Sequence, residues 1–225
     1  SYICTDNQFV VMDCPKTESR IRHIPYERYK DFTTFDISEI QENLSRINWK
    51  KVHNGSGRVT RSSAWFTDEP CKCSYAYGNS IWQAQPFAPW MKALVSEISG
   101  LLNTAQDKIP NSINCNRYDN FSESLNWHAD DEPLFKTIDG NITIVSLSFG
   151  EPRKFCYKKN FTLESEAQHV VLCAGDVLTM EGKMQSHYQH CIPPSSVNAS
   201  SAVRSTTRYN MTMRFVANHK KPCAC

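Results

Sequence analysis

Trp127-His128-Ala129-Asp130-Asp131-Glu132 is the most informative stretch of this chain. His128 and Asp130 are two residues apart, so on an extended strand both side chains leave the same face and can reach one ion. A third ligand must come from elsewhere, and His187 and His190 lie near the end of a later predicted strand. Either histidine would complete a set of two imidazoles and one carboxylate, which is typical of Fe(II) oxygenases.

A second polar pattern lies on one predicted strand close to residue 210. Its alternating polar residues share one face and are Arg208, Asn210, Thr212 and Arg214. Two arginines on one face need anions, and a dicarboxylate co-substrate would supply one because Arg binds a carboxylate through a two-pronged contact. Asn116 and Tyr118 are also co-facial and offer neutral donors to the same carboxylate. The alternative is a structural ion-pair network that matches Arg214 to Asp131 or Glu132.

Hydrophobic periodicity predicts two helices followed by many short strands. Apolar residues at spacings of three and four predict a helix over 37–47, behind the possible caps Asp36 and Ser38, and another over 90–102, after Pro89. Period-two alternation predicts strands over 142–149, 154–158, 169–173, 177–180, 187–192 and 209–216. This order favours an α+β fold whose helices pack on one outer face of a barrel or double-sheet sandwich.

The composition indicates one soluble globular domain. Hydrophobic residues make up 40% of the 225 residues, charged residues 21% and aromatic residues 11%, which excludes a disordered tail, a collagen-like fibre and a coiled coil. The formal net charge of +2 excludes a strongly basic protein, so any surface for a polyanion must be local. No apolar run approaches the roughly 18 to 20 residues that span a bilayer, and we expect no membrane contact.

Five motifs in order resemble the AlkB family of Fe(II)/2-oxoglutarate dioxygenases. They are Asn116-Arg117-Tyr118, Trp127-His128-Ala129-Asp130-Asp131-Glu132, Ser146-Leu147-Ser148-Phe149-Gly150, Gln189-His190 and Arg208-Tyr209-Asn210-Met211-Thr212-Met213-Arg214. The match covers residues 58–216 and is closest to the eukaryotic AlkB homologues that repair alkylated nucleic acid. The resemblance implies a double-stranded β-helix, a jelly-roll type of fold, with iron near one mouth of the barrel.

The same resemblance implies the chemistry and the residues that perform it. It makes His128, Asp130 and His190 the iron ligands and the catalytic centre, with His187 as the second choice for the third ligand. The co-substrate residues that it implies are Arg208 at the distal carboxylate of 2-oxoglutarate, Asn116, Tyr118, Asn210 and Arg214. The implied reaction consumes 2-oxoglutarate and O2, hydroxylates an N-methyl group, and releases succinate, CO2 and formaldehyde.

Residues 58–80 resemble the family's nucleotide-recognition lid, in which aromatic side chains stack an extruded base beside the iron. The implied substrate contacts are Trp65, Tyr75, Tyr77, His128, Asp131 and Glu132 around the base, with Arg58 and Arg61 at phosphates. We therefore expect single-stranded DNA or RNA carrying 1-methyladenine or 3-methylcytosine as the substrate. The alternatives on the same fold are an oxygenase for 6-methyladenine, a protein side chain or a small molecule, and a nucleic-acid-binding protein without turnover.

The predicted organisation is one domain in four segments. They are a helical and extended support over 1–57, the lid over 58–80, the catalytic core with its supporting helix over 81–216, and a cysteine-containing tail over 217–225. An oxygenase that needs reduced iron fits a reducing compartment. We therefore expect a monomer inside the cell, in the nucleus or the cytoplasm, without a disulfide framework.

Ten cysteines are more than a chain of this size needs for its stability. Four of them alternate within predicted strands and are expected in the core or the pocket lining: Cys115, Cys156, Cys173 and Cys191. The remaining feature is two Cys-x-Cys pairs, Cys71 with Cys73 and Cys223 with Cys225. These pairs could share one structural zinc ion, tying the tail to the lid, or be simple exposed thiols.

Overall fold

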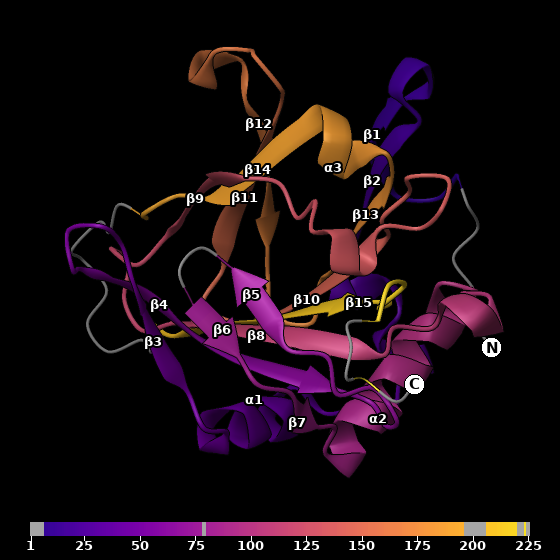
Figure 1. The fold of residues 1–225 in the computed structure, drawn as a ribbon, viewed down its shortest axis with the longest axis vertical. Helices are drawn as coiled ribbons and strands as arrows, with labels where there is room; N and C mark the ends of the chain where they lie inside the picture. Colours follow the sequence, from indigo (N-terminus) through magenta and orange to yellow (C-terminus); the bar gives the residue numbers. More distant parts are fainter. Residues whose placement is uncertain (1–6, 78–79, 196–205, 220–222, 224–225) are drawn as a thin grey trace.

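The computed structural model describes residues 7–77, 80–195, 206–219 and 223. Two antiparallel sheets face each other, and helices cover the outer face of the larger one (Figure 1). The major sheet runs in the order β1 (Val10–Cys14), β2 (Ser19–Ile24), β13 (Val177–Gly182), β10 (Ile144–Gly150), β15 (Arg208–Arg214), β8 (Ser112–Tyr118), β4 (Val59–Thr67) and β3 (Lys50–His53), and β7 (Gln85–Pro86) pairs with β4 in parallel. The minor sheet runs β12 (Gln168–Leu172), β11 (Arg153–Lys159), β14 (Tyr188–Ile192) and β9 (Leu125–His128).

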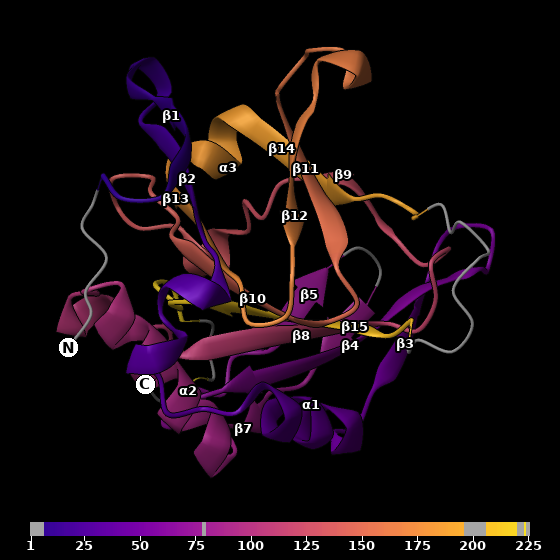
Figure 2. The ribbon, with the colours of Figure 1, turned by 180° about the vertical axis from the view of Figure 1, so that it is seen from behind.

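The two predicted helices form where their caps and apolar stripes place them. In α1 (Ile37–Arg46), the Asp36 carboxylate accepts a hydrogen bond from the Glu39 backbone N–H at 2.9 Å, and Ile40 and Leu44 are buried. The second helix, α2 (Pro89–Leu101), starts with its proline at the first turn, where a missing N–H costs nothing. Both helices lie beneath the major sheet, on the side away from the minor sheet, in both views (Figures 1 and 2). The predicted α+β class and the placement of the helices on one outer face are confirmed.

Smaller elements complete the fold. A short hairpin pairs β5 (Tyr75–Tyr77) with β6 (Ser80–Trp82), and 3-10 turns occupy Pro15–Thr17, Tyr26–Arg28, Lys30–Phe32, Gln106–Lys108, Pro133–Phe135 and Glu164–Glu166. The segment predicted as a lid is therefore divided, since β4 is an internal strand of the major sheet and only β5 and β6 stand apart from it. The support predicted over 1–57 contributes β1, β2 and β3 to the same sheet.

Two predictions about the strands are wrong in detail. The chain over Met184–His187 forms the helical turn α3, so the strand predicted to begin at His187 begins at Tyr188. Cys173 follows the end of β12 and is exposed, whereas we expected it in the core or the pocket lining. Cys115 and Cys191 are buried as predicted, and Cys156 is half-buried.

The register of β15 builds a polar layer between the two sheets. Arg208 lies opposite Tyr118 of β8, and Asn210 lies opposite Asn116. The alternate residues Met211 and Met213 face the other way and belong to the apolar core shared with α1 and α2. Period-two alternation therefore gives one strand an apolar outer face under the helices and a polar inner face toward the minor sheet.

Substituting Gly182 by alanine is expected to lower the free energy of unfolding by about 2 kcal/mol or more. Gly182 has a φ of +68°, and a Cβ there would lie 2.0 Å from the Glu18 backbone oxygen. At Gly100 in α2 a Cβ would meet nothing within 4 Å, so Gly100→Ala should instead stabilise the protein by about 0.5–1 kcal/mol. Urea unfolding of the two variants measures both effects, and equal stabilities would contradict the prediction.

Candidate metal centre and co-substrate pocket

Three metal-ligating side chains converge at the mouth between the two sheets. His128 closes β9, Asp130 follows two residues later, and His190 lies directly opposite His128 in the register of β14 and β9. Asp130 Oδ1 lies 3.5 Å from His128 Nε2, and Asp130 Oδ2 lies 4.0 Å from His190 Nε2. His187 is not part of this cluster: it is the last residue of the helical turn α3, whereas His190 lies on β14.

Arg214 keeps the carboxylate of the cluster charged. Its Nη2 donates to Asp130 Oδ2 at 3.0 Å, and the Asp130 backbone N–H donates to Gln185 Oε1 at 2.9 Å. Burial by itself raises the pKa of Asp130, but Arg214 and the two histidines outweigh it and hold this pKa well below its ordinary value. The alternative that matched Arg214 to Asp131 or Glu132 differs from the structure, in which the ion-pair partner of Arg214 is Asp130 and Asp131 is exposed.

The two histidines direct ring nitrogen atoms at the Asp130 carboxylate. His128 Nδ1 donates to the Asn126 carbonyl at 2.8 Å, and this contact orients the ring so that Nε2 faces Asp130. Burial, assisted by the charge of His128, lowers the pKa of His190 to about 3, and the Phe155 ring stacks on it at 5.3 Å. Two imidazoles and one carboxylate are the donor set that non-haem Fe(II) takes, so the residues fit this metal.

Next to the cluster, a buried arginine stands at the inner end of the pocket. Arg208 is 1% exposed, its guanidinium lies 5.4 Å from the Tyr118 ring centre, and its Nη2 donates to Ser148 Oγ at 3.1 Å. Within the described part of the chain, Arg208 Nε and Nη1 have no hydrogen-bond partner. Burial lowers its pKa to about 10, so the side chain is still charged at neutral pH. A buried cation with unused donors fits the carboxylate of a small anion.

The remaining predicted co-substrate residues line the same pocket and support one another. Asn210 Nδ2 donates to Ser146 Oγ at 2.7 Å. Asn116 Oδ1 accepts from Arg61 Nε at 2.9 Å and from a neighbouring serine hydroxyl on β4. The lining includes Asn116, Tyr118, Arg208, Asn210 and Arg214 together with the three residues of the cluster. The structure therefore brings the metal-ligating set and the predicted co-substrate set into one cavity.

Two tyrosines form the wall predicted for a base. Tyr75 and Tyr77 line the pocket, the Tyr75 hydroxyl donates to Glu132 Oε1 at 2.7 Å, and the Tyr77 ring meets the His128 ring edge-on at 6.2 Å. Burial raises the pKa of Glu132. Trp65 does not line the pocket: it is 1% exposed and stacks behind Tyr75, with ring centres 4.8 Å apart. Trp65 was predicted to contact a base directly, but in the structure it packs against Tyr75 and supports that ring.

The two arginines predicted at phosphates occupy different places. Arg61 is 5% exposed and lies inside the pocket, 5.5 Å from the Tyr77 ring centre. This buried position does not suit a contact with the phosphates of a nucleic acid strand outside the pocket. Arg58 is exposed and donates to the Ser122 carbonyl at 3.0 Å. Of the two, only Arg58 faces solvent as a phosphate contact requires.

The sequence reasoning gave Arg61 a different place and missed Phe155 and Gln185. Arg61 alternates with Ser63 on β4, so its position on the polar inner face could have been found from the same period-two rule that gave Arg208. Phe155 lies on a predicted strand, but an apolar residue there looks like any core position. Gln185 has no local signal, because its role depends on α3 folding back over Asp130.

Comparison with known proteins agrees with this geometry. A sequence profile described as the 2OG-Fe(II) oxygenase superfamily matches residues 35–214. The chain belongs to this superfamily. Its matched region contains the complete cluster, the buried Arg208 and the whole pocket wall. The members use Fe(II), 2-oxoglutarate and O2, which are the cofactor and co-substrates that the residues here fit.

Curated relatives confirm the resemblance to AlkB proteins. The chain is 30% identical over 195 residues to the alpha-ketoglutarate-dependent dioxygenase alkB homolog 3 of Bos taurus, covering 80% of this chain and 62% of the relative. The corresponding protein of Homo sapiens is 31% identical, with 66% and 51% covered. The DNA oxidative demethylase ALKBH2 of Arabidopsis thaliana is 31% identical, with 47% and 38% covered. The chain thus spans about half to three-fifths of the length of the alkB homolog 3 proteins that it matches.

Solved structures share the fold at low sequence identity. OsALKBH1 superposes with a TM-score of 0.60 at 16% identity, covering 92% of this chain and 99% of that one. A 2OG-Fe(II) oxygenase family oxidoreductase from Burkholderia pseudomallei gives 0.56 at 12% identity, with 88% and 86% covered. The predicted jelly-roll core is confirmed. Among the described residues, no helix has the length and apolar character needed to cross a bilayer.

Proposed function

We propose that this chain is an Fe(II)- and 2-oxoglutarate-dependent dioxygenase that demethylates N-alkylated bases in single-stranded DNA or RNA, with 1-methyladenine and 3-methylcytosine as its substrates. The observation that carries the proposal is Arg208, a buried cation with unused donors beside a cluster of two histidines and one carboxylate. A protein that only bound nucleic acid would gain nothing from this charge, which is costly to bury.

The proposed roles follow from the contacts. His128, Asp130 and His190 would hold the iron, and Arg214 would keep the Asp130 carboxylate charged and oriented. Arg208 would bind the distal carboxylate of 2-oxoglutarate from the inner end of the pocket. The bound iron supplies oxidation of a C–H bond by O2, coupled to conversion of 2-oxoglutarate to succinate and CO2. An N-methyl group then becomes an N-hydroxymethyl group, which leaves as formaldehyde.

The substrate class is supported by the outer part of the pocket. Tyr75 and Tyr77 offer stacking surfaces near His128, and the Glu132 carboxyl is fixed by the Tyr75 hydroxyl at 2.7 Å. Aromatic rings bind bases without strong sequence preference, which suits repair of scattered lesions. A carboxyl group at this depth can accept from, or when protonated donate to, the edge of a base. The relatives are named as dioxygenases and as a DNA oxidative demethylase, which agrees with this proposal.

A panel of oligonucleotides tests the proposal. The full chain is incubated with Fe(II), 2-oxoglutarate, ascorbate and single- or double-stranded oligomers of DNA or RNA that carry 1-methyladenine, 3-methylcytosine or 6-methyladenine. Formaldehyde and succinate should appear in equal amounts with the first two bases in single strands. Succinate without formaldehyde across the whole panel would contradict the proposed substrate and point to a protein side chain or a small molecule.

Tyr77→Ala is expected to raise the KM for a methylated oligonucleotide roughly 10- to 100-fold, because stacking on one aromatic ring contributes about 1–3 kcal/mol. Tyr77→Phe keeps the ring and should stay within about twofold of the wild type. The slow conversion of 2-oxoglutarate without oligonucleotide serves as the control, since it depends on the metal centre and should not change. Equal KM values for all three proteins would exclude Tyr77 from the base pocket.

A further inference from the structure

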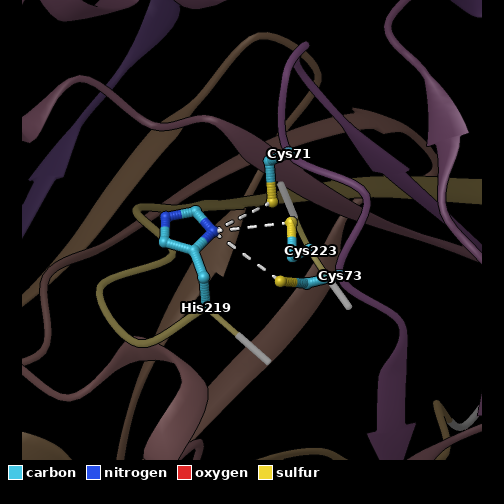
Figure 3. A group of neighbouring side chains, drawn as sticks. All are labelled: Cys71, Cys73, His219 and Cys223. Atoms are coloured by element: carbon cyan, nitrogen blue, oxygen red, sulfur yellow. Dashed lines mark hydrogen bonds between the residues drawn. The ribbon is translucent and has the colours of Figure 1, made fainter. Parts of the chain in front are cut away.

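A second cluster of metal-ligating side chains lies outside the pocket. Cys71 and Cys73 come from the connection between β4 and β5, and His219 and Cys223 come from the chain after β15. Figure 3 shows the three sulfur atoms directed at one nitrogen of the His219 ring. The His219 Nδ1 atom lies 3.6 Å from Cys71 Sγ, 3.7 Å from Cys73 Sγ and 3.9 Å from Cys223 Sγ. Two segments that lie far apart in the sequence thus meet at one point.

These separations are those of a tetrahedral centre. With Zn–S bonds of about 2.3 Å and a Zn–N bond of about 2.0–2.1 Å, tetrahedral angles place nitrogen and sulfur about 3.6 Å apart. All four ligand atoms lie within 4.8 Å of one another. A disulfide would join two sulfur atoms and would not require an imidazole nitrogen near-equidistant from three of them. The geometry therefore favours a metal ion over a disulfide.

The surroundings also suit metal-bound thiolates. Cys71 and Cys73 are 3% and 2% exposed, so the ion would be shielded from water on their side. The Lys72 backbone N–H donates to Cys223 Sγ at 3.2 Å, a contact that stabilises negative charge on sulfur. Three thiolates and one imidazole in a tetrahedron are a usual donor set for structural zinc, whereas the pocket cluster of nitrogen and oxygen donors suits Fe(II).

We infer that Cys71, Cys73, His219 and Cys223 bind one structural Zn²⁺ ion. The set differs from the sequence-based hypothesis, which had Cys225 as the fourth ligand and did not include His219. Cys225 lies outside the described residues. The available signal was the interval of four residues from His219 to Cys223, which falls within the spacings of zinc ligands. It was missed because the two Cys-x-Cys pairs by themselves supply four donors.

The ion would stabilise the wall of the pocket. The Cys73 carbonyl accepts from Trp65 Nε1 at 2.8 Å, and Tyr75 begins β5 two residues after Cys73. On the tail side, Asn218 Nδ2 donates to the Pro133 carbonyl at 2.7 Å, next to Glu132. One ion would therefore fix, from both sides, the two segments whose side chains form the Tyr75–Glu132 hydrogen bond.

Metal analysis of the purified full chain, kept in reductant, tests the inference. We expect about one zinc per chain in addition to the iron. Cys73→Ser should lose the zinc and keep the iron, while Asp130→Ala should lose the iron and keep the zinc. Cys173→Ser removes an exposed cysteine outside the cluster and should change neither. Substitution of the zinc by Co²⁺ should give thiolate-to-cobalt charge-transfer and tetrahedral d–d absorption bands that Cys73→Ser abolishes.

His219 is tested separately, because loss of zinc in one variant could follow from unfolding. His219→Ala should bind zinc much more weakly, and His219→Cys, which restores a tetrahedral donor set, should recover about one zinc per chain. Cys225→Ser should retain the zinc. The inference is overturned by a wild-type protein that binds no zinc when refolded with it in reductant, or by zinc that survives His219→Ala but not Cys225→Ser.

Discussion

His190→Ala is expected to reduce succinate formation at least about a hundredfold. Removing a residue that only orients a metal ligand typically costs roughly 10- to 100-fold, and removing a ligand itself should cost more. His190 is one of three residues whose ligand atoms converge, and its ring lies between His128 and the stacked Phe155. The loss should appear both with and without oligonucleotide, since it removes iron rather than substrate. Iron content and succinate release measure it.

His187→Ala is the matched control for this prediction. The two histidines are three residues apart, but His187 ends α3, outside the cluster, so its variant should keep iron and turnover within about twofold. If His187→Ala is inactive and His190→Ala is active, the metal ligand has been assigned to the wrong histidine. A variant that loses both iron and its circular dichroism signal reports unfolding, and His190→Gln then repeats the test with a side chain of similar size.

Much of the site could be predicted because its residues follow local rules. The spacing of His128 and Asp130 on an extended strand fixes their common face whatever the rest of the fold does. The same period-two rule placed Arg208, Asn210 and Arg214 on one side of β15, and the register with β8 brought Asn116 opposite Asn210. The helices were equally local, since Asp36 caps α1 where its apolar stripe begins.

The errors come from contacts between distant segments. Three consecutive acidic residues follow Ala129, and only the three-dimensional path of the chain after β9 selects Asp130 as the partner of Arg214. Trp65 and Tyr75 stack on each other, and the sequence does not say which of the two rings lines the pocket. The two Cys-x-Cys pairs indicated that the tail could meet the lid, but the contact of His219 with Cys71 and Cys73 depends on the path of the tail after β15.

Arg208→Ala is expected to raise the KM for 2-oxoglutarate roughly hundredfold or more. Hydrogen bonds to charged groups contribute about 1.5–3 kcal/mol each, and a two-pronged contact with a carboxylate has two of them. Arg208→Lys keeps the charge but not the planar pair of donors, so its KM should fall between those of the wild type and Arg208→Ala. Arg46→Ala, on the exposed face of α1, is the control and should leave the KM unchanged.

Stability measurements distinguish a ligand-binding arginine from a structural one. Arg208 is almost fully buried, and its Nε and Nη1 atoms have no partner among the described residues, so its charge weakens the ligand-free fold. Arg208→Met should therefore unfold at an equal or higher temperature than the wild type while failing to bind 2-oxoglutarate. Adding 2-oxoglutarate with a redox-inert divalent metal should raise the melting temperature of the wild type and not that of Arg208→Met. A strongly destabilised Arg208→Met would show instead that the guanidinium holds the sheets together, and the co-substrate would then have to be bound elsewhere in the pocket.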